Sequence, residues 1–354
     1  MKKELLMASA LVSTLGAASV AQAVTATTAG SMKVGAEFES ADDSTVDSNT
    51  VHDYSNFNVS LTETTDGGTT ISSSFEILDE GTAAGDDDNA IKLTFSDGSA
   101  LELLNAGNAS STHAVGVPGA SGEQGVGGTT TNNAPTGIDF SAGSTPLGVE
   151  WHSAADFLAD GLKVSASYST DNEAAKTATA KLSSSWGIGA TYVTTAGDST
   201  ITIGGGLSDS EVKKTGTQLT ADKGGMHVGI TAVTGDLTIG VGYGDGDSFD
   251  DDGAGATNTP VQIDGSVFKA GIKYVSGDIT LAIGTVAGEA KDSTTLGTAG
   301  TTDDSHDATS ASVTYSVASG ISAIVGYTTV DQNNEGSSTT DGGSSWYVGA
   351  TMSF

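Results

Sequence analysis

The feature that most constrains this chain is a repeated pair of alternating segments joined by a tight turn. Every second residue from Trp186 to Tyr192 is apolar, the chain turns at Gly197-Asp198, and apolar residues then alternate back. The same arrangement recurs around the turn glycines Gly235, Gly277 and Gly320. A period of two predicts β-strands, and tilted strands of about 9–11 residues are long enough to cross a bilayer.

The connections between these segments fall into two kinds. Tight turns rich in Gly and Asp alternate along the chain with longer acidic stretches, at about 40–53, 79–89, 245–263, 289–307 and 331–343. If the chain enters from the periplasm, every tight turn falls on one side of the membrane and every long stretch on the other. Short periplasmic turns and long external loops are typical of outer-membrane barrels.

The aromatic residues near the strand ends support the same interpretation. Tyr168, Tyr243 and Tyr327 end strands that run outward, whereas Tyr192, Tyr274, Tyr315 and Phe354 end strands that run inward. This predicts two aromatic belts, one at each membrane interface. A soluble β-sandwich would instead concentrate its large residues in mid-strand, at the core.

We therefore predict an all-β fold, a transmembrane antiparallel up-and-down β-barrel of about sixteen strands. The pattern is less regular in the first half, and a long aperiodic stretch at about 105–146 interrupts it. A loop of that length inside a compact domain is expected only where it is functional. The strand boundaries between 140 and 190 stay open, because residues 176–184 could form a separate strand.

The first residues predict export through a cleaved signal peptide. Met1-Lys2-Lys3 precedes an apolar stretch, which ends at the small-x-small sequence Ala21-Gln22-Ala23. We expect residues 1–23 to be the signal peptide and residues 24–354 to form the barrel in the outer membrane.

Composition excludes several function classes. The formal net charge is −31 and the chain has no Arg, so nucleic acid is not an expected partner. It also has no Cys, which excludes thiol chemistry and Cys-bound metals. Five His are scattered along the chain without metal-ligand or catalytic spacing, so we expect no enzyme activity.

Three segments resemble a known family. Gly161–Tyr168, the Leu93–Gly98 turn and the terminal Ser345–Phe354 are similar to general porins of Gram-negative bacteria, particularly the alphaproteobacterial type. The resemblance implies a homotrimer of sixteen-stranded barrels, each with a long third loop, here 105–146, folded into the lumen. It implies passive diffusion of small hydrophilic solutes and ions. It also implies a terminal signal for the barrel-assembly machinery, made by Trp346, Val348, Ala350, Met352 and Phe354.

In this family the loop is acidic and faces a basic wall, mostly of Arg. Glu123 and Asp139 are the acidic candidates in the loop, and Lys must replace Arg on the wall. A Lys on the lipid face costs about 2–4 kcal/mol at mid-bilayer, so alternation favours lumen positions. The pore-lining candidates are Lys33, Glu37, Lys92, Glu102, Lys163, Lys269 and Lys273. Polar residues such as Ser165, Ser167, Thr238, Ser312 and Thr314 are expected to hold the water column.

Several alternatives stay open. The loop could lie outside the lumen, and each Lys could be merely solvated or salt-bridged. A substrate-selective porin would need an aromatic slide, for which Tyr347 is one of few candidates. A structural or adhesive barrel with a plugged lumen is the rival from another class. The acidic excess predicts weak cation preference. No cofactor is expected, although Asp245, Asp247, Asp250 and Asp252 offer oxygen ligands suited to calcium.

Overall fold

The structure is a computed structural model. It describes residues 24–41, 48–79, 90–104, 109–120, 125–126, 129–130, 147–170, 181–213, 220–250, 261–292, 304–333 and 342–354. The predicted signal peptide, Glu123, Asp139 and Asp252 therefore lie outside the described residues. Among the described residues, no helix is long and apolar enough to span a membrane.

Sixteen strands form one closed barrel, as predicted. Its strands are β1 (Thr25–Ala41), β2 (Ser48–Thr64), β3 (Thr70–Asp79), β4 (Ile91–Thr94), β5 (Ala100–Leu103), β8 (Leu147–His152), β9 (Leu162–Thr170), β10 (Lys181–Ala196), β11 (Ser199–Lys213), β12 (Thr220–Thr234), β13 (Leu237–Asp250), β14 (Val261–Ser276), β15 (Ile279–Asp292), β16 (Asp304–Ala318), β17 (Ile321–Asn333) and β18 (Gly343–Ser353). A short helix, α2 (Ala109–Thr112), and a separate two-stranded sheet, β6 (Gly125–Val126) with β7 (Thr129–Thr130), complete the described elements.

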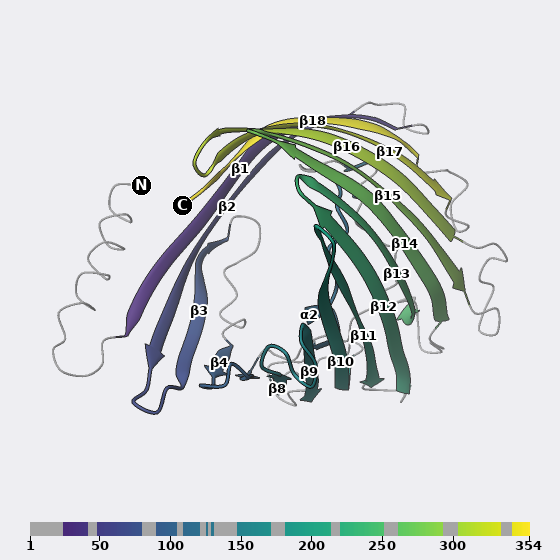
Figure 1. Ribbon diagram of the computed structural model, residues 1–354. Coiled ribbons are helices and arrows are strands. Elements are labelled where there is room, and N and C mark those ends of the chain that lie inside the picture. Colours follow the sequence, from purple (N-terminus) through teal and green to yellow (C-terminus); the bar gives the residue numbers. More distant parts are fainter. Residues whose placement is uncertain are drawn as a thin grey trace.

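Each strand pairs antiparallel with its neighbour in the chain order of the wall, and the barrel closes where β1 meets β18 (Figure 1). At this seam Met32 lies opposite Met352, and Phe38 lies opposite Trp346. The seam ends with a reciprocal backbone pair, in which Gly30 N donates to Phe354 O (3.0 Å) and Phe354 N donates to Gly30 O (3.1 Å). Because β1 and β18 pair with each other, neither terminal strand of the sheet is left as an open edge, which would be unfavourable in a bilayer.

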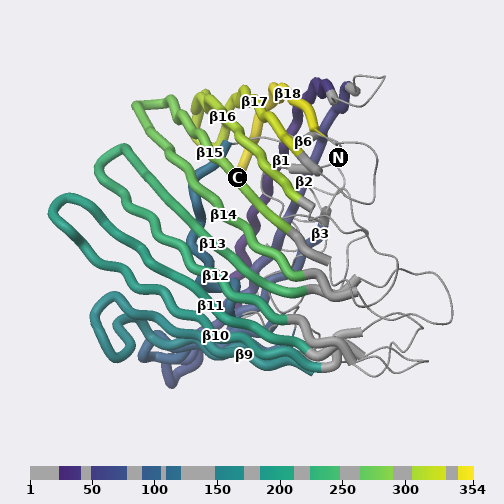
Figure 2. The backbone as a smooth tube through the Cα atoms, turned by 90° about the vertical axis from the view of Figure 1, so that its right-hand side faces the viewer, coloured from purple at the N-terminus to yellow at the C-terminus, as the bar shows by residue number. Residues whose placement is uncertain are grey.

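The tight turns lie together at one end of the barrel (Figure 2). Between β10 and β11 only Gly197 and Asp198 connect the strands, and Gly197 has a φ of 61°. Gly235 and Gly277 occupy the same place in the next two hairpins, with φ of 56° and 60°. A two-residue hairpin of this kind needs a positive φ at its first position, which glycine adopts without steric cost.

Side chains alternate between the lumen and the outer surface, as the period of two predicts. Trp186, Ile188 and Tyr192 are exposed on the outer surface of β10, whereas Ser185 is buried on the inner side. Both groups of aromatic residues predicted as belts share this outer face. The belt residues that are exposed on the outer face are Tyr168, Tyr192, Tyr243, Tyr274, Tyr315 and Phe354.

Two expectations about strand length were wrong. The external connections are shorter than predicted, because β13 continues to Asp250 and β14 already begins at Val261. Strands can continue beyond the bilayer, since ladder hydrogen bonds form in water as well as in lipid, and acidity alone does not mark where pairing ends. In contrast, β4 and β5 have four residues each, fewer than a bilayer crossing needs. The segment that could have been a separate strand is in part the start of β10, at Lys181.

Candidate functional site

A segment of the predicted third loop lies inside the barrel. We call residues Ala109–Ala120, which begin with α2, the strap. A methyl carbon added at Gly189 of β10 would lie 2.6 Å from the carbonyl oxygen of Ala109, and one at Gly284 of β15 would lie 3.0 Å from Gly119 Cα. Because both glycines face inward, the strap follows the inner wall from β10 to β15. The prediction that the loop enters the lumen is confirmed for this segment.

The next described part of the loop lies on another side of the barrel. Strand β6 is adjacent to β1, β17 and β18. The loop therefore contacts the wall at two separate places, first at β9–β15 and then at the seam. Glu123 and Asp139 stay predictions for the constriction.

Hydrogen bonds attach the strap to the wall. His113 is bonded through Nε2 to Ser165 Oγ (2.8 Å) and through Nδ1 to Thr191 Oγ1 (2.7 Å). His227 Nε2 donates to the carbonyl oxygen of Ser110 (2.8 Å). The strap is thus held by side chains of β9, β10 and β12.

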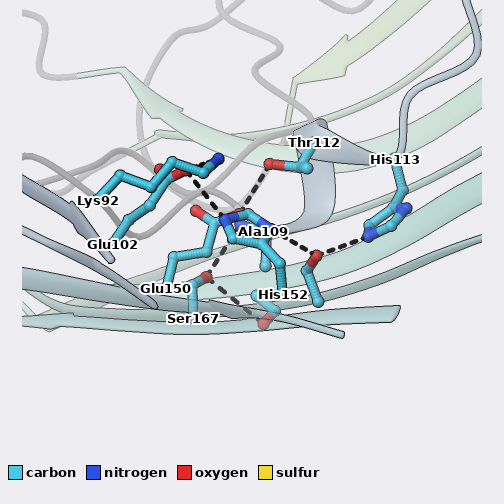
Figure 3. A network of polar contacts seen from close by, with 10 residues as sticks. Lys92, Glu102, Ala109, Thr112, His113, Glu150, His152 and Ser167 are labelled. Carbon is cyan, nitrogen blue, oxygen red and sulfur yellow. Dashed lines mark hydrogen bonds and ion pairs between the residues drawn. The ribbon is translucent and has the colours of Figure 1, made fainter. Parts of the chain in front are cut away.

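The N-terminal end of the strap has two further bonds to the wall (Figure 3). The backbone N–H of Ala109 donates to Ser167 Oγ (3.0 Å), and Thr112 Oγ1 donates to Glu150 Oε1 (2.7 Å). Ser165 and Ser167 were expected to hold the water column, and that prediction was wrong. Both are buried, because the strap covers them and uses their hydroxyls.

Ion pairs continue this network across β4, β5 and β8 (Figure 3). Lys92 Nζ donates to Glu102 Oε1 (2.6 Å), and His152 Nε2 lies 3.2 Å from the same oxygen and 3.8 Å from Glu150 Oε1. Lys92 and Glu102, both predicted pore residues, therefore lie in one lumen cluster as a pair. A paired charge presents a weaker field to passing ions than an isolated one.

His113 lies inside the barrel against the inner wall, where the neutral form of its imidazole is favoured. Burial lowers the pKa of the His113 imidazole below its usual value, and the nearby His152, His227 and Lys163 lower it further. The ring is therefore held uncharged near neutral pH, and it retains both an N–H donor and an acceptor nitrogen for its two hydroxyl partners.

A second polar cluster lies at the seam. His52 Nε2 of β2 is 2.9 Å from Glu37 Oε2 of β1, and Lys33 Nζ lies 5.7 Å from the centre of the Tyr54 ring. Tyr347 of β18 is 1% exposed, and its ring lies against the glycines Gly35 and Gly349. Since Tyr347 is covered, it offers no surface on which a solute could slide.

The lumen wall is balanced in charge. Among the inward positions whose side chains the structure describes, register and alternation place five lysines and five glutamates: Lys33, Lys92, Lys163, Lys269 and Lys273 against Glu37, Glu39, Glu76, Glu102 and Glu150. Of these lysines, Lys33, Lys163 and Lys273 are exposed, whereas Lys269 is less so. The described charged side chains of this inner face therefore sum to zero.

Sequence reasoning missed the histidines of this site. His113, His152 and His227 are far apart in the sequence, yet His113 belongs to the strap and the other two lie on the wall close to it. Spacing along the chain could not show this, because each histidine comes from a different element. A partial signal existed, since Glu150 and His152 both face inward on a strand that was predicted.

The terminal segment forms β18 at the seam of the barrel. Trp346, Val348, Met352 and Phe354 are exposed on the outer surface of β18 and its end, whereas Ala350 is half-buried. The Phe354 ring covers Gly30 at the seam. Recognition of these residues by the assembly machinery stays a prediction.

The acidic end of β13 was the candidate calcium site. Asp245 Oδ2 accepts a hydrogen bond from the Tyr243 hydroxyl (3.1 Å), and Asp247 Oδ1 accepts one from Gly224 N (2.6 Å). Among the described residues, no group of three or more His, Asp or Glu could hold a metal ion. The side chain of Asp250 and all of Asp252 lie outside the described part, so the calcium hypothesis stays a prediction.

Comparison with known proteins agrees with this geometry. A family model described as Gram-negative porin matches residues 8–353. No curated protein matches the chain.

Several solved structures are similar in fold. OmpT of Vibrio cholerae in its trimer form is 20% identical, with a TM-score of 0.61, over 94% of this chain and 99% of that one. An anion-selective porin from Comamonas acidovorans is 14% identical, with a TM-score of 0.63, over 94% and 100%. The outer-membrane channel DcaP of Acinetobacter baumannii is 12% identical, with a TM-score of 0.66, over 94% and 97%.

Proposed function

The chain belongs to the Gram-negative porins and is an outer-membrane channel for passive diffusion, and from this premise we propose that it is a homotrimeric, non-enzymatic pore with weak ion selectivity. The observation that supports weak selectivity is the equal number of Lys and Glu among the described side chains of the lumen wall. Most of these charges offset one another, so the wall itself favours neither ion sign strongly.

A weak cation preference follows from the remaining charges. The formal net charge is −31, and aspartates such as Asp245 and Asp307 lie on the outer face or near the strand ends. Fixed acidic charge near a pore mouth raises the local cation concentration, and salt screens the effect over a Debye length of about 10 Å at 0.1 M.

Reversal potentials across planar bilayers test the selectivity. In a tenfold salt gradient we expect a small potential of cation-selective sign, which shrinks as the mean salt concentration rises. Clear anion selectivity would contradict the proposal, and silence from correctly folded protein would favour the plugged, structural barrel instead. Liposome swelling with uncharged sugars of increasing size then measures the size limit.

The trimer is supported by the low wall on one side of the barrel. The paired parts of β4 and β5 are four residues long, which corresponds to roughly 14 Å at 3.4 Å per residue, against a hydrocarbon core of about 30 Å. The neighbouring β2 also exposes Asp53 on its outer face. A short wall with an outward carboxylate is better covered by another subunit than by lipid.

The mass of the detergent-solubilised protein tests this point. We expect a trimer by light scattering, and cross-linking through a cysteine placed at Asp53 but not through one placed at Val241 on the opposite outer wall. A monomeric mass at bilayer-active concentrations would contradict the trimer without affecting the channel proposal.

One arrangement resembles a catalytic triad. Ser165 Oγ lies 2.9 Å from His152 Nδ1, and His152 Nε2 lies 3.2 Å from Glu102 Oε1. Ser165 is 1% exposed and is also bonded to His113, so a substrate has no access to its hydroxyl. We therefore assign this row a structural role. Ester hydrolysis by the wild type that disappears in Ser165→Ala would contradict that assignment.

A further inference from the structure

On strands β10 to β15 the strap lies against a series of inward-facing glycines. The positions are Gly187 and Gly189 on β10, Gly204 and Gly206 on β11, Gly229 on β12, Gly240 and Gly242 on β13, Gly271 on β14 and Gly284 on β15. We call this set the glycine track. It spans six consecutive strands, and the strap follows it from Ala109 to Gly119.

Backbone conformation does not explain these glycines. None of the track glycines has a φ in the left-handed range, whereas the turn glycines do. Glycine in a strand is otherwise unfavourable, because it loses more backbone entropy on folding and contributes no side chain to packing. A reason specific to the inner surface is therefore required.

Space supplies that reason. A methyl carbon at Gly206 would lie 2.5 Å from Ser110 Oγ and 2.6 Å from Ser110 Cα, and one at Gly204 would lie 2.5 Å from the carbonyl oxygen of His113. One at Gly271 would collide with the carbonyl oxygen of Pro118. Because these obstacles are mostly strap backbone, a rotamer change cannot remove them.

The track ends where the strap leaves the wall. Gly284 pairs with Ser310 on the neighbouring β16, and inward positions there carry side chains, as at Ser310 and Ser312. Thr328 and Ser345 continue the same row on β17 and β18. On β10–β15 the inward glycines of the track are thus matched to strap contact, whereas the inward Gly35 and Gly349 at the seam lie against the Tyr347 ring instead.

From this match we infer that the glycine track is a docking groove for the strap, and that its depth sets the width of the open lumen. Since favourable contacts between carbon atoms need about 3.5–4.0 Å, an added methyl group at 2.5 Å forces the strap roughly 1 Å toward the pore axis. The glycines are therefore positioning residues for permeation, although they do not line the water column. This inference rests on the channel function.

Alanine substitutions test the inference by single-channel conductance. Gly206→Ala and Gly204→Ala are expected to lower the conductance relative to wild type. Gly242→Ala is expected to have a smaller effect, because its methyl group would meet a side-chain methyl group of Val117 at 3.2 Å, a longer distance than at Gly204 or Gly206. Gly116→Ala, in the strap itself, is the matched control, since a methyl group there would meet nothing within 4 Å.

A labelling experiment tests the docking itself in case the track variants do not fold. The chain has no Cys, so a single cysteine reports its own exposure. The side chain of Val115 lies against Gly204 and Gly229, so the cysteine of Val115→Cys should react slowly with a charged thiol reagent. The side chain of Ala114 is exposed, so the cysteine of Ala114→Cys should react fast. Gly229→Ala should accelerate labelling of the first cysteine and leave that of the second unchanged.

The outcomes separate the track from the channel. A conducting wild type with equal conductance in Gly206→Ala, Gly204→Ala and Gly116→Ala would overturn the docking groove, as would equal labelling at positions 114 and 115. A wild type that does not conduct would overturn the channel function instead, and slow labelling at position 115 would still support docking.

Discussion

Removing the histidines that hold the strap should release it for measurable periods. At least five hydrogen bonds between described residues join the strap to the wall, two of them through His113 and one through His227. At a net value of about 1 kcal/mol each, they favour the docked strap by about 5 kcal/mol. Since each 1.4 kcal/mol is a factor of ten, the released fraction is then roughly one in several thousand.

The double variant His113→Ala/His227→Ala loses three of these bonds. About 2 kcal/mol is left, so the released fraction rises to roughly one in thirty. His227→Ala alone leaves about 4 kcal/mol, and the released fraction stays near one in a thousand. Only the double variant should therefore show a second conductance level that is visited often.

Single-channel recordings in planar bilayers measure these fractions directly from dwell times. His52→Ala is the matched control, because His52 lies in the same lumen but contacts Glu37 instead of the strap. If recordings of the double variant have the same levels and noise as those of the wild type and the control, the strap is not held by these bonds, and the reasoning fails.

Four further predictions concern pH, charge, assembly and calcium. Burial and neighbours such as Lys163 lower the pKa of His113, so the neutral ring stabilises the docked strap fully above the ordinary pKa of 6.5. This stabilisation is lost as the pH falls through the lowered pKa. Fluctuations of the single-channel conductance should therefore increase on acidification, and should increase less in His113→Gln. Lys92→Gln should shift the reversal potential toward cation selectivity, and Glu102→Gln should shift it toward anion selectivity. A single charge 4 Å from an ion in water changes the local ion concentration by at most roughly fivefold, which limits both shifts. Equal shifts in one direction would contradict the pairing. Phe354→Ala should lower the yield of folded barrel in cells, as measured by heat-modifiable migration in gels, because the seam loses the ring that covers Gly30; an unchanged yield would argue against the terminal signal. If calcium binds the acidic end of β13, a chelator should lower the unfolding temperature, and an unaffected temperature would end that hypothesis.

Much of the barrel could be predicted because its causes are local. Alternation from Trp186 to Tyr192 requires only that one face meets lipid and the other does not, and each residue shows its preference by itself. The hairpin at Gly197 is equally local, since a positive φ at one position favours glycine there. Strand number, orientation and the outer face follow from such signals.

The lengths of the strands could not be predicted in the same way. On β13 pairing continues to Asp250, although the acidic residues there suggested a loop. On β4 pairing stops after four residues, although apolar residues alternate there as in a longer strand. Whether a ladder continues depends on the neighbouring strand, which the residues of one strand do not reveal. The low wall at β4 and β5 is therefore a property of the assembled barrel.

By itself, the sequence determined that polar and apolar residues alternate, that tight turns lie on one side of the membrane and that the last strand ends in an aromatic residue. Each of these properties depends only on neighbours within a few residues. The tertiary structure alone decided what the inward glycines and the histidines do. Gly206 and Gly284 lie on different strands, and four complete wall strands, β8 to β11, separate His113 from His227 in the sequence. Only when six strands lie side by side does a set of missing side chains become a groove, and only the groove shows why the strap lies where it does.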